Sequence, residues 1–215
     1  LVEPYARILG VRDRLDGMDL LRHVEAMGRV SHRSEDAQTR DSWEKFVTSV
    51  VLTHGDWSIT EHASVTVEVL ADRGVTHEWV RHRLGAYTQE STRFVNYVKK
   101  VGLQFVRPPG MPDARGVWEA SVAAAQAAYK TLLLDGVSPQ VARSVLPNAL
   151  ASKLMVTYNL RGWRHFFIMR TTREAHPQMR DITIPLLEEF QEKIPLLYDD
   201  IEPLARQVEG MRLPE

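Results

Sequence analysis

Two short stretches of alternating apolar and polar residues most constrain the fold of this chain. In residues 62–69 the valines fall on alternate positions, and in residues 152–158 Leu154, Val156 and Tyr158 alternate in the same way. This period of two is typical of strands with one buried face. Elsewhere apolar residues recur at spacings of three and four, as in amphipathic helices. We therefore predict an α+β fold, with several helices packed around a small, mostly antiparallel sheet.

The helical segments and their boundaries can be placed from the same patterns. Ser138 and Pro139 are suited to begin a helix, and Pro147 to end it. Residues 84–93 are small and polar without a period, so we predict a loop there. A length of 215 residues suits one domain, which we expect to span 1–215. Helices are predicted at residues 19–27, 42–51, 75–83, 114–134, 139–146, 161–171 and 177–208, the last broken near Pro195 and Pro203.

Composition excludes several kinds of chemistry. The chain has no cysteine, which rules out disulfides, thiolate metal sites and a cysteine nucleophile. A net charge of −1 weighs against a general nucleic-acid binder. No apolar run approaches the roughly 20 residues of a membrane span, and no signal peptide is visible. We expect a cytoplasmic protein that binds neither nucleic acid nor membrane.

Positive charge is nevertheless concentrated in two segments. Residues 77–107 contain six Lys or Arg against two Glu, and residues 160–180 contain five Arg against one Glu. The planar guanidinium of Arg binds phosphate or carboxylate in a bidentate way. Two local Arg clusters in a neutral chain therefore indicate a compact anionic ligand, such as a nucleotide phosphate.

One segment is specific enough to suggest a family. Arg81-His82-Arg83 is followed by seven residues and then Ser91. This pattern resembles the signature of flavin-dependent thymidylate synthases. Further matches in family order extend the resemblance over residues 55–180; they are Glu61-His62, Val141-Ala142-Arg143 before Leu146-Pro147, Asn159, Met169-Arg170 and His176-Pro177-Gln178. The chain departs from the family pattern at Glu78, Gln89, Phe94 and His165.

The resemblance implies an activity and its partners. Members of the family transfer a one-carbon unit from methylenetetrahydrofolate to dUMP, and FAD carries the hydride that NADPH supplies. The implied fold is that of this family, and the implied assembly is a homotetramer with active sites at subunit interfaces. No metal is implied. The absence of cysteine agrees with this route, because the unrelated class of thymidylate synthases uses a cysteine nucleophile.

The resemblance also implies roles for individual residues. Arg170 is the catalytic candidate, since it would stabilise negative charge that develops on the uracil ring. The residues expected to bind dUMP are Ser91, Arg93 and Arg143 at the phosphate, with Gln89, Glu90 and Arg170. The residues expected to bind FAD are His62, Arg81, His82, Arg83, Gln89, Asn159, His165 and His176.

Other functions stay open from the sequence. The same fold could add a different one-carbon group to a pyrimidine nucleotide. A nucleic-acid-binding module would use the same arginines, but no motif of that kind is present. A zinc enzyme is disfavoured, because His82 follows His77-Glu78 one residue too late for the H-E-x-x-H spacing that places both histidines on one helix face.

Overall fold

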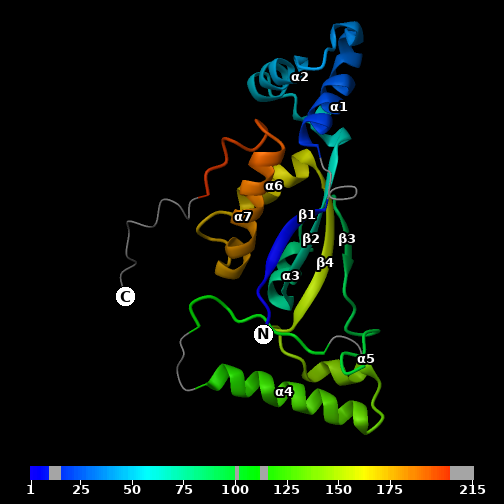
Figure 1. Ribbon diagram of the computed structural model, residues 1–215, viewed down its shortest axis with the longest axis vertical. Coiled ribbons are helices and arrows are strands. Elements are labelled where there is room, and N and C mark those ends of the chain that lie inside the picture. Colours follow the sequence, from blue (N-terminus) through cyan, green and yellow to red (C-terminus); the bar gives the residue numbers. More distant parts are fainter. Residues whose placement is uncertain (10–15, 100–101, 112–115, 204–215) are drawn as a thin grey trace. The chain divides into compact units, whose positions relative to one another are not determined.

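The computed structural model describes residues 1–9, 16–99, 102–111 and 116–203. Its sheet has four strands in the order β1-β2-β4-β3 (Figure 1). Strand β2 (Ser64–Asp72) contains residues 64–69 of the first alternating stretch, and β4 (Ala151–Asn159) contains all of the second; the valines of β2 are buried. The predicted α+β class with a small, mostly antiparallel sheet is confirmed.

The chain divides into two compact units. Unit 1 comprises residues 1–5, 69–81 and 87–155, and unit 2 comprises residues 6–68, 82–86 and 156–215. Strands β2 and β4 each contribute residues to both units, so the expectation of a single domain over 1–215 stays a prediction.

Unit 1 contains α3 (Arg73–Trp79), α4 (Val117–Leu134), α5 (Pro139–Ala142) and the 3-10 turn η6 (Arg143–Val145). The Asp72 side chain caps α3 by accepting a hydrogen bond from the backbone N–H of Val75. Pro139 begins α5, as the sequence predicts. Helix α4 packs against α5 and η6, over a core of Tyr97, Phe105, Tyr129, Ala142 and Leu150.

Unit 2 contains two pairs of helices. Helix α1 (Gly17–Arg29) packs against α2 (Ser42–Phe46), and α6 (Leu160–Arg170) packs against α7 (Pro177–Lys193) (Figure 1). Buried aromatic rings fill the second pair, with Trp163, Phe167 and Phe190 in mutual contact. The remaining elements are the short η2 (Val30–His32), η3 (Glu35–Ala37) and η5 (Trp57–His62), and a π-helix η4 (Val47–Thr53).

Two strands differ from the sequence-based prediction. The predicted loop 84–93 contains β3 (Ala86–Gln89), and β1 (Tyr5–Leu9) has no counterpart among the predicted elements. Both are edge strands that lack a clear period, and backbone bonds to their neighbours decide their conformation. The backbone N–H of Glu90, for example, donates to the carbonyl of Lys153 at 2.8 Å.

Several helices are shorter than predicted, among them α5, which continues as η6, and α7, which ends at Lys193. Two predictions extend beyond the described residues. The helix predicted over 75–83 ends at Trp79, and Leu84 has a left-handed backbone with φ of 64°. Residues 114–115 and 204–208 of the other predicted helices lie outside the described part of the chain.

Candidate functional site

Unit 1 brings three of the predicted phosphate ligands into one cluster. The Arg93 Nε donates to the Gln140 Oε1 at 3.1 Å, and the Arg143 Nη1 donates to the Thr92 Oγ1 at 3.2 Å. The backbone N–H of Arg93 donates to the Ser91 Oγ at 3.3 Å. Residues 91–93 thus lie against the helical segment 139–145, and we call Ser91, Thr92, Arg93, Gln140 and Arg143 the phosphate cluster.

The charges of the phosphate cluster are available to a ligand. Both Arg93 and Arg143 are exposed, and neither forms an ion pair with a carboxylate among the residues that the structure describes. Gln140 and Thr92 are uncharged partners, so their hydrogen bonds orient the guanidinium groups without cancelling the positive charge. Two oriented guanidiniums without acidic partners suit a phosphate dianion.

Gln89 and Glu90 lie next to β4 of unit 1. The Gln89 Nε2 donates to the hydroxyl groups of Thr76 and Ser152 at 2.8 and 3.2 Å, and both hydroxyl residues are buried. Burial raises the pKa of Tyr97 above its ordinary value, and the nearby Glu90 carboxylate adds to the rise. Gln89 is therefore held by buried partners, and Glu90 lies beside the core of unit 1.

In unit 2, His82 and Arg170 contact each other directly. The Arg170 Nε donates to the His82 Nε2 at 2.8 Å, and we call these two residues the His82–Arg170 pair. Burial, together with the charges of Arg170 and His165, lowers the pKa of His82 to about 4. His82 is therefore neutral at physiological pH, and its Nε2 can accept a hydrogen bond.

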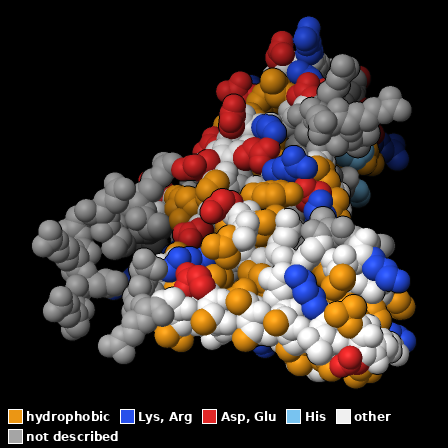
Figure 2. Space-filling view, turned by 60° about the horizontal axis from the view of Figure 1, so that its bottom comes forward, with side chains coloured by type: hydrophobic (Ala, Val, Ile, Leu, Met, Phe, Trp, Pro, Cys, Tyr) orange, Lys and Arg blue, Asp and Glu red, His pale blue; other side chains and the backbone are white. Residues whose placement is uncertain are grey.

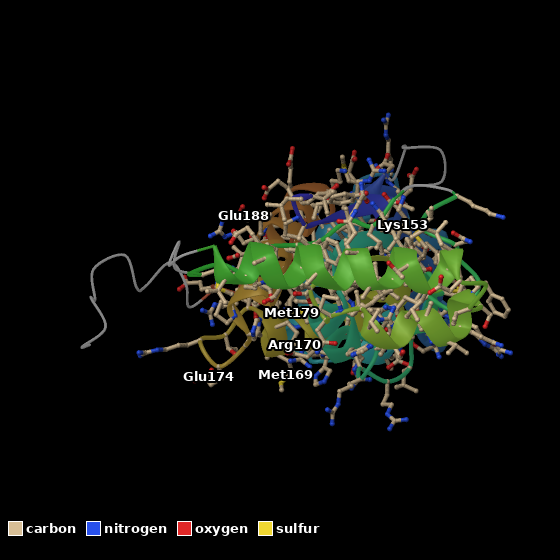
Figure 3. All side chains as sticks on the ribbon, turned by 90° about the horizontal axis from the view of Figure 1, so that it is seen from below. Lys153, Met169, Arg170, Glu174, Met179 and Glu188 are labelled. Carbon is tan, nitrogen blue, oxygen red and sulfur yellow. The ribbon has the colours of Figure 1, made fainter. Side chains whose placement is uncertain are left out.

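Arg170 is the last residue of α6, and a residue within α7 bonds its carbonyl. The Thr183 Oγ1 donates to the carbonyl of Arg170 at 2.9 Å. Figure 3 shows Met169 and Arg170 of α6 near Met179 of α7. Met179 is fully buried, whereas Met169 is half exposed. The His82–Arg170 pair therefore lies at the boundary between the buried contact of α6 with α7 and the solvent-exposed surface.

The other predicted flavin residues of unit 2 are more dispersed. Asn159 caps α6, since its Oδ1 accepts from the backbone N–H of Gly162 at 2.7 Å. His165 lies 6.0 Å from His82, measured between ring centroids. His62 at the end of η5 and His176 before α7 are exposed, and no hydrogen bond joins either to the His82–Arg170 pair in the described part of the chain.

Two arginines of the signature have the chemistry that a flavin dinucleotide requires. Arg81 and Arg83 are exposed, and neither guanidinium has an acidic partner within the described ranges. The pyrophosphate of FAD carries two negative charges that such groups can bind. The residues present therefore fit this cofactor.

The structure also identifies site residues that sequence reasoning missed. Thr92 and Gln140 orient the two arginines of the phosphate cluster, while Thr76 and Ser152 hold Gln89. Two features of the sequence could have indicated them. Thr92 lies between Ser91 and Arg93, and Gln140 lies one helical turn before Arg143.

No group of three or more His, Asp or Glu in the described part of the chain is placed to hold a metal ion. No described helix is long and apolar enough to cross a membrane.

Comparisons with known proteins point to one family. Residues 15–196 match the family described as thymidylate synthase complementing protein. The flavin-dependent thymidylate synthase of Mycobacterium sp. (strain KMS) is 34% identical over 217 residues, which cover 89% of this chain and 84% of the relative. That of Pyrococcus furiosus is 34% identical over 188 residues, which cover 85% of this chain and 75% of the relative.

A solved structure supports the fold. The crystal structure of a UMP/dUMP methylase, PolB from Streptomyces cacaoi bound with 5-Br dUMP, superposes with a TM-score of 0.71. The superposition covers 95% of each chain at 21% sequence identity, so the two proteins share a fold.

Proposed function

Because this chain belongs to the thymidylate synthase complementing protein family, the flavin-dependent thymidylate synthases, we propose that it methylates dUMP to dTMP. The one-carbon donor would be methylenetetrahydrofolate, the cofactor FAD and the reductant NADPH. The observation that carries the proposal is the phosphate cluster, in which neutral partners hold the exposed guanidiniums of Arg93 and Arg143 and the Ser91 hydroxyl accepts from the Arg93 backbone.

We assign the dUMP phosphate to Ser91, Arg93 and Arg143. Their separation along the chain matters little, because the contacts with Thr92 and Gln140 bring them together. Each charge-assisted hydrogen bond to the phosphate would contribute about 1.5–3 kcal/mol. Gln89 and Glu90 immediately precede Ser91 in the sequence, and we propose that they contact the rest of the nucleotide.

We assign the uracil ring to Arg170. A guanidinium beside the ring would stabilise negative charge that develops as C5 becomes nucleophilic. No thiol is available to attack the ring, since the chain has no cysteine. FAD, when bound, would supply the reducing hydride. Arg81 and Arg83 would hold its pyrophosphate, and His62, Asn159, His165 and His176 are the further candidates for contacts with it.

We propose further that the protein acts as a homotetramer in which different subunits contribute the phosphate cluster and Arg170. Exposed apolar side chains of unit 1 support a partner surface: Phe94 beside Arg93 is 76% exposed, and Leu134 of α4 is 84% exposed. Figure 2 shows hydrophobic side chains spread over the face that carries α4. A cytoplasmic location stays a prediction.

A second candidate concerns the nucleotide and the group added to it. PolB, which shares the fold, is described as a UMP/dUMP methylase. The same site chemistry would serve a ribonucleotide or another one-carbon substituent, since groups that bind the phosphate do not distinguish the sugar 2′ position or the substituent at C5. Product identity separates these candidates.

Activity of the purified protein tests the proposal. We expect a yellow protein whose flavin absorbance bleaches on anaerobic addition of NADPH. With dUMP and ¹⁴C-labelled methylenetetrahydrofolate it should form labelled dTMP, identified by chromatography against standards. Parallel reactions with UMP, and with dUMP but no NADPH, are the controls. A protein that takes up no FAD, or that labels UMP in preference to dUMP, would disprove dTMP synthesis as its function.

A further inference from the structure

We infer that His82 is a positioning residue for Arg170: its imidazole accepts the Nε–H of Arg170 and so fixes the plane of the guanidinium that faces the substrate. The inference rests on the proposed function in one respect, the assignment of uracil to Arg170. It differs from the role that the sequence suggests for His82, which is a direct contact with the flavin.

The hydrogen bond determines the state of both side chains. The Arg170 Nε lies 2.8 Å from the His82 Nε2 and can only donate, so Nε2 must be the unprotonated nitrogen. The neutral ring therefore carries its proton on Nδ1. A guanidinium is planar, so a bond at Nε sets the orientation of the whole group. The imidazole thereby restricts the directions in which Arg170 can present its terminal N–H groups.

Packing on α6 places the imidazole at the right position for this bond. The His82 ring meets Phe166 edge to face, with 4.9 Å between ring centroids. Phe166 and Arg170 are four residues apart on α6 and therefore share one helix face. The imidazole that packs on Phe166 is therefore next to the Arg170 side chain. The hydrogen bond from Thr183 to the Arg170 carbonyl holds the backbone of the same residue.

The electrostatic surroundings keep the acceptor available. Two charged or titratable groups that lower the pKa of His82 are Arg170 and His165, and both belong to α6. Each disfavours a second positive charge, and burial acts in the same direction, so the pKa of His82 falls to about 4. The imidazole therefore stays neutral and able to accept at neutral pH, whereas an ordinary histidine, with a pKa of about 6.5, begins to lose its acceptor just below neutrality.

The first test separates orientation from binding. His82→Phe keeps a ring against Phe166 but removes the acceptor, and His82→Gln restores an acceptor through its amide oxygen. We expect His82→Phe to lower kcat for dTMP formation about 10- to 100-fold, with KM for dUMP and flavin content each within about threefold of wild type. His82→Gln should recover most of kcat. The matched control is His77→Phe, since His77 also contacts an arginine, Arg73, at 3.4 Å but lies outside the site.

The second test does not depend on activity. In protein labelled with ¹⁵N-histidine, NMR should show His82 as the Nδ1–H tautomer that titrates near pH 4. The Arg170 Nε–H should exchange slowly with water in wild type and His82→Gln, and fast in His82→Phe. An Nε2–H tautomer, or His82→Phe with wild-type kcat, would overturn the inference. Loss of flavin from both His82 variants would also overturn it, because that loss would show that His82 contacts the flavin directly. A wild-type protein with the expected tautomer but no dTMP synthesis would instead refute the proposed function.

Discussion

At the scale of single residues, the distinction that matters is between arginines that are neutralised and arginines that are not. Arg22, Arg29 and Arg164 each pair with a carboxylate at 2.5–2.7 Å, and such groups stabilise the fold. Arg93 and Arg143 have only neutral partners in the described part of the chain. Unpaired guanidiniums that are nevertheless held in place are suited to bind an anion.

Removal of either guanidinium should therefore weaken substrate binding selectively. Arg93→Ala and Arg143→Ala should each raise the Kd for dUMP about 10- to 100-fold, which corresponds to a lost charge-assisted hydrogen bond of about 1.5–3 kcal/mol. Bound flavin should remain. Isothermal titration with dUMP measures the affinity, absorbance reports the flavin, and Arg22→Ala serves as a control with a paired arginine. Unchanged dUMP affinity in both variants would show that the dUMP phosphate does not bind at the phosphate cluster.

At the scale of elements, the start of α6 shows how a residue can match a functional motif and still have a structural task. Asn159 accepts the backbone N–H of Gly162 at 2.7 Å and begins the helix that ends at Arg170. An N-cap of this type contributes about 1 kcal/mol. The cap thus helps to fix the helix on which the His82–Arg170 pair depends.

Substitution at this cap separates the two tasks of Asn159. Asn159→Ala should lower the free energy of unfolding by about 1 kcal/mol, and Asn159→Asp should preserve it, because a carboxylate oxygen also caps a helix. Urea denaturation monitored by circular dichroism measures both. If Asn159 also contacts FAD through its amide N–H groups, the Asp variant should be stable yet depleted of flavin. Equal stability of the Ala variant and wild type would contradict the capping role.

At the scale of the whole molecule, the candidate residues lie in different compact units. The phosphate cluster belongs to unit 1 and the His82–Arg170 pair to unit 2. A homotetramer with active sites at subunit interfaces would allow one subunit to supply the first and another subunit the second. Activity would then depend on assembly. Dilution to a protein concentration at which the tetramer dissociates should abolish activity.

Complementation between inactive variants tests this arrangement. Arg93→Ala and Arg170→Ala tetramers should each be nearly inactive, because each of their sites lacks one guanidinium. Subunits mixed under mild denaturant and reassembled should regain part of the wild-type rate, since some sites would combine an intact Arg93 with an intact Arg170. The reassembled species is checked by size-exclusion chromatography with light scattering. No recovery in a mixed tetramer would show that a single subunit supplies both residues.

The sequence by itself determined the elements with strong local periodicity and the family. The valines of β2, the alternation of β4 and the helical spacing in α1, α4 and α6 each depend on residues close together in the chain. The arginine signature is local as well, so its spacing could be recognised without coordinates. Ser91, Arg93 and Arg143 were predicted to bind one phosphate, and the structure places them in one cluster.

Only the tertiary structure decided the edge strands β1 and β3 and the partner of each functional side chain. Arg93 meets Gln140 across 47 residues, Arg143 meets Thr92 across 51, and Arg170 meets His82 across 88. The low pKa of His82 has the same origin, because burial and the charges of α6 impose it. Periodicity records how a segment buries its own face, whereas these contacts depend on which distant segment covers that face.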